Sequence, residues 1–219
     1  MKTIRVFFEK KDRAKYISHL DLTRCVTRAF ARTGLPAWFT EGFNPHLYLT
    51  FALPLPLGVE GDRETFDFRL VEDDFPLKRV GERLNAALPV DLRVVDCAEA
   101  VMKPEAIAWA DYEIQIFDPV GSAALWSDWE RFLARPSILA EKKTKHKTRE
   151  IDLKPLITQL SRSGEGDCLT LNLRLPAGAA LNLTPALPLS AFWADRGGEA
   201  DYIQMRRTAI LTEELRPFL

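Results

Sequence analysis

The chain has 219 residues, of which 47% are hydrophobic and 28% are charged, a composition typical of globular proteins. No segment approaches the roughly 20 consecutive apolar residues that a membrane-spanning helix needs, and the N-terminal MKTIRVFFEKK lacks the apolar run of a signal peptide. We therefore expect a soluble, cytoplasmic protein that does not enter a membrane.

The formal net charge of −1 conceals an uneven distribution. Residues 1–58 carry nine Lys/Arg against four Asp/Glu, whereas residues 59–113 carry seven against fourteen. A further basic segment, KKTKHKTR at residues 142–149, contains no acidic residue. Such runs are most often solvated surface, and the alternative is an anion-binding patch.

The chain contains three cysteines at wide spacing, Cys25, Cys97 and Cys168. They form neither a C-x-x-C pair nor the C-x-x-x-C-x-x-C motif of radical enzymes, so the sequence predicts neither a disulfide framework nor a metal centre. We expect packing roles for the thiols, and no cofactor or metal on this chain.

The first half begins with TIRVFFEK, whose β-forming residues predict a strand, followed by a helix between Ser18 and Gly34. Ser18 is suited to cap the helix start, with Asp21 three residues later, and Gly34 to end it. LYLTFA and RETFDFRL predict two strands, PLKRVGERLNAALP a helix and DLRVVDCAEAV a last strand. The order β-α-β-β-α-β is that of the ferredoxin-like split unit.

After Lys103 a similar order begins again. ADYEIQIF predicts a strand, SAALWSDWERFLAR a helix, and ILAEKKTK and TREIDLKPLI a pair of extended segments. DCLTLNLRLPAG predicts a strand, TPALPLSAFWAD a short helix and DYIQMRRTAIL a final strand. We predict an α+β protein of two ferredoxin-like halves, residues 1–103 and 108–219, each an antiparallel sheet with helices on one face.

The segment TEGFNPHLYLTFALPLPLGVEG, residues 40–61, combines prolines and glycines with many apolar side chains. Proline fixes φ and glycine permits unusual φ values, so we expect a preorganised loop. Its apolar residues Phe43, Phe51, Leu53 and Leu57 are predicted to be buried against the first helix. We also expect Trp38, Phe39 and Trp193 in the core, because no R/K-G-F-x-F signature of base stacking is present.

Two histidines stand in distinctive places. His19 lies in the first turn of the first helix, preceded by Tyr16, and the turn Asn44-Pro45-His46 presents a second imidazole. One interpretation is purely structural, with local hydrogen bonding. A second is a paired acid–base or phosphate-contacting site, since histidine titrates near neutral pH. A metal site is the third, although two histidines are too few ligands.

Basic side chains recur on two predicted elements. Arg24, Arg28 and Arg32 repeat every four residues and so form one row on the helix, rising about 6 Å per step. Lys143, Lys145, Lys147 and Arg149 alternate along an extended segment and so share one face. Both sets are ordinary solvated surface or, alternatively, phosphate contacts of an RNA strand.

The segments YISHLDLTRCVTRAFARTGLP, EGFNPHLYLTFALPLPLGVEG, ETFDFRL and EKKTKHKTREIDLKPLI resemble those of the radical-SAM-associated (radical-SAM-linked) family of unknown function. The similarity runs over most of the chain. In that family the domain stands alone or follows a radical S-adenosylmethionine (radical-SAM) enzyme in one polypeptide. The resemblance implies a partner or substrate-handling role, with the radical chemistry left to an enzyme in trans.

Three functions are consistent with the sequence. The preferred one is an accessory RNA-binding or substrate-presenting module that acts with a radical-SAM enzyme and is noncatalytic by itself. The first alternative is a metal-independent endoribonuclease in which His19 and His46 act as acid and base. The second is a protein-interaction adaptor whose proline-rich loop docks a partner, which an exposed apolar patch near Leu53–Val59 would favour.

Overall fold

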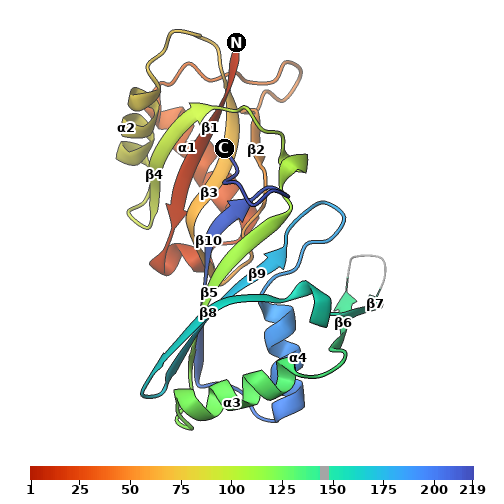
Figure 1. Ribbon diagram of the computed structural model, residues 1–219. Coiled ribbons are helices and arrows are strands. Elements are labelled where there is room, and N and C mark those ends of the chain that lie inside the picture. The colour runs from red at the N-terminus through yellow and green to blue at the C-terminus, as the bar shows by residue number, and fades with distance from the viewer. Residues whose placement is uncertain (144–147) are drawn as a thin grey trace. The chain divides into compact units, whose positions relative to one another are not determined.

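The computed structural model describes residues 1–143 and 148–219 and is a mixed α+β structure, with antiparallel strands and four α-helices in these ranges (Figure 1). The α+β class predicted from the sequence is confirmed. The chain divides into two compact units, one of residues Met1–Ala106 with Arg216–Leu219 and the other of residues Ile107–Leu215.

The first unit contains a sheet in the order β4-β1-β3-β2, in which each neighbouring pair is antiparallel. Its elements are β1 (Lys2–Lys10), the 3-10 turn η1 (Asp12–Tyr16), α1 (His19–Thr33), β2 (Leu49–Phe51), β3 (Val59–Leu70), α2 (Leu77–Ala87), β4 (Leu92–Glu99) and the turn η2 (Pro104–Ala106). Every strand and helix predicted for residues 1–103 is present.

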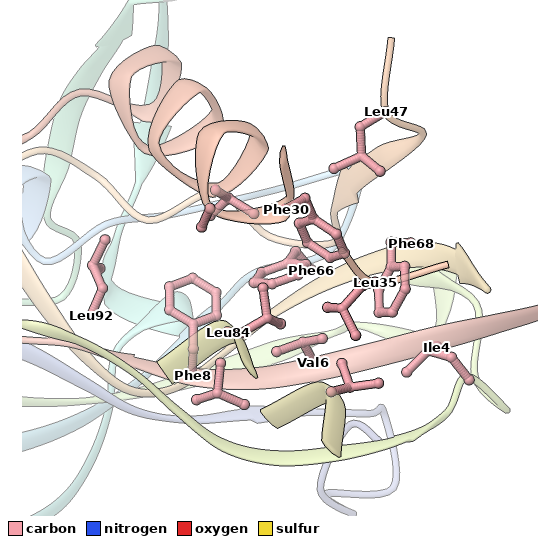
Figure 2. Packing of buried hydrophobic residues seen from close by; sticks show 14 of the residues in the cluster. Ile4, Val6, Phe8, Phe30, Leu35, Leu47, Phe66, Phe68, Leu84 and Leu92 are labelled. Atoms are coloured by element: carbon pink, nitrogen blue, oxygen red, sulfur yellow. The ribbon is translucent and has the colours of Figure 1, made fainter. Parts of the chain in front are cut away.

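Both helices of the first unit pack on one face of this sheet. Alternate residues of β1 and β3 point toward the helices, and Figure 2 shows the resulting cluster of aromatic and aliphatic side chains. The ring of Phe30 from α1 lies 4.8 Å from that of Phe68 and 6.3 Å from that of Phe66. Asp67 and Arg69 alternate with these residues along β3 and therefore lie on the opposite face of the sheet.

The first helix starts and ends as the sequence predicts. Ser18 is the N-cap, and its hydroxyl accepts a hydrogen bond of 3.1 Å from the Asp21 amide. Gly34 ends the helix with φ of 60°, a left-handed conformation that favours glycine. Leu22, Val26 and Phe30 form the buried stripe.

A buried ion pair lies on the face of the sheet opposite the helices. The Arg5 guanidinium binds both carboxylate oxygens of Asp67, with distances of 2.8 and 2.7 Å. It also donates to the carbonyl oxygens of Met102 and Leu219, at 2.9 and 2.8 Å. These hydrogen bonds compensate the desolvated charge of Arg5 and hold the C-terminal residues of this unit against the sheet.

The second unit contains a sheet in the order β10-β5-β9-β8 and a separate two-stranded sheet of β6 and β7. Its elements are β5 (Trp109–Phe117), α3 (Ser122–Leu133), β6 (Leu139–Lys143), β7 (Thr148–Asp152), the turn η3 (Lys154–Leu156), β8 (Thr158–Glu165), β9 (Cys168–Pro176), α4 (Ala186–Arg196) and β10 (Tyr202–Leu211). Strand β8 was not predicted from the sequence, and β6 and β7 form the predicted extended pair.

Candidate functional site

The two sequence motifs place their histidines at different points of the first unit. His19 is the first residue of α1, and its ring meets the Phe51 ring edge-on at 4.9 Å. Desolvation of the imidazole, with a smaller contribution from the charge of Lys10, lowers the pKa of His19 below its ordinary value. Within the described residues its ring nitrogens have no hydrogen-bond partner, and the exposed imidazole faces solvent.

Large apolar side chains are exposed on the segments next to His19. Tyr16, Leu20 and Leu57 have exposed fractions of 63%, 57% and 65%. The Gly58 amide donates to the Lys15 carbonyl at 2.8 Å, which holds the Leu57 turn beside η1. We call Tyr16, Leu20 and Leu57 the apolar corner; such an exposed group of large apolar side chains is typical of an interaction site.

Buried charged residues lie next to the apolar corner. Lys15 and Glu60 are both buried and form an ion pair of 3.1 Å. The ammonium group of buried Lys10 donates to the Ile17 carbonyl at 3.3 Å. The pairing of Lys15 with Glu60 was not predictable from the sequence, because the two residues are 45 positions apart.

His46 closes a short loop of residues 40–46. The Thr40 amide donates to the His46 carbonyl at 2.8 Å, the His46 amide donates to the Thr40 hydroxyl at 3.1 Å, and that hydroxyl lies 2.9 Å from His46 Nδ1. The Asn44 carbonyl lies 3.3 Å from the same ring nitrogen. These contacts confirm local hydrogen bonding of His46, as the structural interpretation of the sequence expected.

The predicted burial of the loop is correct for one residue of four. Leu53 is buried and Phe51 is half-buried, whereas Leu57 is exposed and Phe43 is fully exposed, at 107% of its reference area. The prediction was wrong for Phe43 because the contacts between Thr40 and His46 close the loop on itself and leave its tip in solvent. Leu57 faces outward because the chain turns at Gly58, where φ is 81°.

The structure separates the two histidines. Leu47, Leu49 and Phe51 pack against the hydrophobic core, so the extended chain before β2 directs His46 to the opposite face. Five residues of extended chain span about 16 Å, and His19 contacts the Phe51 end. The pair is therefore not arranged to act on one phosphate.

A second aromatic group lies near the base of the loop. The Arg69 guanidinium carbon is 5.1 Å from the centre of the Trp38 ring and 4.4 Å from that of Tyr48. Trp38 is half-buried and Phe39 has an exposed fraction of 43%, so the prediction that both belong to the core was wrong, whereas Trp193 is buried as expected. Backbone hydrogen bonds of Trp38 with Arg69 and with Tyr48 bring these three residues together. We call Trp38, Tyr48 and Arg69 the aromatic platform.

The arginine row on α1 faces solvent as predicted, but two of its members already have partners. Arg24 forms an exposed ion pair of 3.2 Å with Asp21, and Arg32 donates to the Ala87 carbonyl at the end of α2, at 2.6 Å. Arg28 has no such partner in the part of the chain that the structure describes. The three arginines are therefore less suited to contact successive phosphates of an RNA strand.

The basic segment of the second unit is described only in part. Lys145 and Lys147 lie outside the described residues, and Lys143 ends β6. Arg149 is exposed on β7, where it pairs in register with Lys142. Burial, and to a smaller extent the charge of Arg149, lowers the pKa of Lys142, which donates to the Asn182 carbonyl at 2.6 Å.

Cys25 and Cys97 lack the lowered pKa of reactive thiols. Burial, with a contribution from Asp96, raises the pKa of Cys97 to about 12, and burial also raises that of Cys25. Among residues 1–143 and 148–219, no group of three His, Cys, Asp or Glu side chains could hold a metal ion, and no helix has the length and apolar character to cross a membrane.

The amino-acid sequence matches that of a known protein family. Residues 3–185 match DUF2344, described as an uncharacterized protein conserved in bacteria. No curated protein matches the chain. Since the match covers most of the chain, including η1, α1, the 40–46 loop and the β6–β7 pair, the protein belongs to the DUF2344 family.

Proposed function

We propose that the chain is an accessory RNA-binding module that presents its ligand to a radical-SAM enzyme and is noncatalytic by itself. The observation that carries the proposal is the loop of residues 40–46, which holds the Phe43 ring fully in solvent. A large aromatic side chain that a loop closed by Thr40 and His46 presents to solvent is available to contact a partner. A closed loop also loses little conformational entropy on binding.

The chemistry of the surrounding residues favours RNA as that partner. Aromatic rings and arginine planes stack on unpaired bases, and cationic side chains contact phosphates. The aromatic platform supplies both kinds of group, and Arg28 adds a solvent-facing charge without a partner among the described residues.

The radical-SAM partner rests on the resemblance of the SHLD and GFNPH segments to the radical-SAM-associated family. In this proposal the partner enzyme, acting in trans in the cytoplasm, holds the cluster, and this chain needs no cofactor of its own. We further propose that both units are ferredoxin-like. Strand orders β4-β1-β3-β2 and β10-β5-β9-β8 support this, with β6 and β7 inserted in the second.

A protein-interaction adaptor is the second candidate, and the apolar corner favours it. Tyr16, Leu20 and Leu57 are large, exposed and close to the proline-rich segment. The endoribonuclease is not favoured, because His19 and His46 lie at opposite ends of an extended segment.

The proposal is tested by fluorescence anisotropy with a labelled single-stranded RNA at low salt. We expect the wild-type chain to bind without shortening the RNA, and Phe43→Ala to weaken binding about tenfold through the lost stacking ring. Val90→Ala, which removes another exposed apolar side chain of the same unit, should leave the affinity unchanged. Absence of binding by the folded protein would reject the RNA function and leave the adaptor.

A further inference from the structure

We propose that the aromatic platform of Trp38, Tyr48 and Arg69 receives an unpaired base, so that the RNA ligand is single-stranded at this site. This inference rests on the proposed RNA-binding function and assigns it a second contact besides Phe43.

The platform is built by strand register. The ladder of β2 and β3 ends at the pair Leu49–Phe68, and Tyr48 and Arg69 are the next residues of the two segments. The Trp38 amide donates to the Arg69 carbonyl at 2.9 Å, and the Tyr48 amide to the Trp38 carbonyl at 3.3 Å. Backbone bonds thus fix all three residues, and the two rings lie 6.0 Å apart at 55°.

Arg69 differs from Arg5 and Arg63 of this sheet in its hydrogen bonds. Arg5 is bound by Asp67, and Arg63 pairs with Asp96 at 3.1 Å. In the described ranges no protein acceptor binds the Arg69 guanidinium, which only the two rings hold in place. The half-buried guanidinium therefore keeps N–H donors that no described protein acceptor uses, while the rings keep it in one orientation.

The position of the platform matches a ligand that also reaches Phe43. Arg69 lies on the face opposite the core, because Phe68 and Leu70 on either side of it are buried against the helices. Trp38 and Tyr48 directly flank the segment that leads into the 40–46 loop. Leu47 and Leu49 face the core, so His46 and Tyr48 lie on the opposite side of the extended chain, which places the loop next to the platform.

These properties favour a nucleic acid with unpaired bases as the ligand of the platform. A planar base can stack on the exposed parts of the rings, and the guanidinium can donate to a base edge or to a phosphate. In a duplex the bases are paired and stacked, so duplex RNA offers this surface only its backbone. A negatively charged strand also complements the unpaired charge of Arg69.

The test compares a labelled oligouridylate of about ten nucleotides with the same strand annealed to its complement. We expect the single strand to bind more tightly than the duplex. Tyr48→Leu and Arg69→Gln should each weaken single-strand binding about tenfold, whereas Tyr48→Phe, which keeps the ring, should bind within twofold of wild type. Arg93→Gln removes an exposed strand charge of the same unit and serves as the control.

The outcomes separate this inference from the function on which it rests. If the wild-type chain binds the oligouridylate but Tyr48→Leu and Arg69→Gln bind equally well, the platform is not the contact and the RNA function stands. If the wild type binds no RNA, both fail. A 4-thiouridine strand cross-linked to the wild type and mapped by mass spectrometry provides a readout that does not depend on variant folding. It should attach to Trp38 or Tyr48, and attachment confined to other segments would overturn the inference.

Discussion

His19 is an exposed histidine that a ligand can reach. Its ring is held edge-on by Phe51, and partial desolvation together with Lys10 lowers its pKa. Because the folded-state pKa lies below the unfolded value, the stability associated with neutral His19 is complete above about pH 6.5 and is lost as the pH falls through the folded-state pKa.

An NMR titration checks this placement. We expect the His19 resonance, identified with a His19→Gln variant, to titrate below the ordinary histidine pKa. Phe51→Ala uncovers the ring, so the pKa of His19 should rise toward its ordinary value. An unchanged pKa in Phe51→Ala would contradict desolvation by Phe51 as the main cause.

The ion pair of Arg5 and Asp67 predicts a large effect on stability. Arg5 is fully buried, so Asp67→Ala leaves a desolvated charge without its main partner and should lower the free energy of unfolding by about 3–5 kcal/mol. Asp91→Ala removes the partner of Arg13, whose side chain is 85% exposed, and should cost less than about 1 kcal/mol. Urea unfolding of both variants measures the difference, and equal losses would contradict it.

At the scale of elements, the start of α1 depends on one side chain. Ser18→Ala removes the cap and should lower the free energy of unfolding by about 1 kcal/mol. Thr23→Ala is the matched control, because the Thr23 hydroxyl bonds only the His19 carbonyl and alanine is the better helix former. Urea unfolding should show Thr23→Ala at least as stable as wild type; a larger loss there than in Ser18→Ala would contradict the capping role.

The loop of residues 40–46 should open more easily without the Thr40 hydroxyl. Thr40→Val removes the acceptor of the His46 amide, and about 1 kcal/mol per lost hydrogen bond corresponds to roughly fivefold faster hydrogen exchange of the Thr40 amide. Thr50→Val, the same change at an exposed position of β2, should leave this rate unchanged. Equal rates in wild type and Thr40→Val would show that the hydroxyl does not close the loop.

The elements that the sequence predicted are those with an apolar face. In RETFDFRL apolar and polar side chains alternate, and in the first helix apolar residues recur at helical spacing, so these patterns indicate both elements directly. The structure buries the polar Thr65 and Asp67 of the strand as well, which its alternation does not predict. Strand β8 was missed because seven of its eight residues are exposed, and pairing with β9 alone makes it a strand. An edge strand with little burial leaves no periodic signal in the sequence.

Across the whole chain, the sequence predicts the fold better than it predicts the candidate site. The sequence located the SHLD and GFNPH segments, but hydrophobicity alone favoured burial of Phe43, which loop closure prevents. The aromatic platform had no signal at all, because Trp38 and Arg69 are 31 positions apart and meet only through the register of β3 with its neighbours. Charge periodicity likewise could not show that Arg24 and Arg32 already have partners.

We propose that this DUF2344 protein binds single-stranded RNA through the 40–46 loop and the aromatic platform. Ultraviolet cross-linking in cells that express the chain, followed by purification, sequencing of the attached RNA and mapping of the attached peptides, tests it most directly. We expect RNA attached to peptides that contain residues 37–48, and a large loss of recovered RNA in a Phe43→Ala/Arg69→Gln double variant. Recovery of no RNA above that from a non-cross-linked sample, or equal recovery from the folded double variant, would contradict the claim.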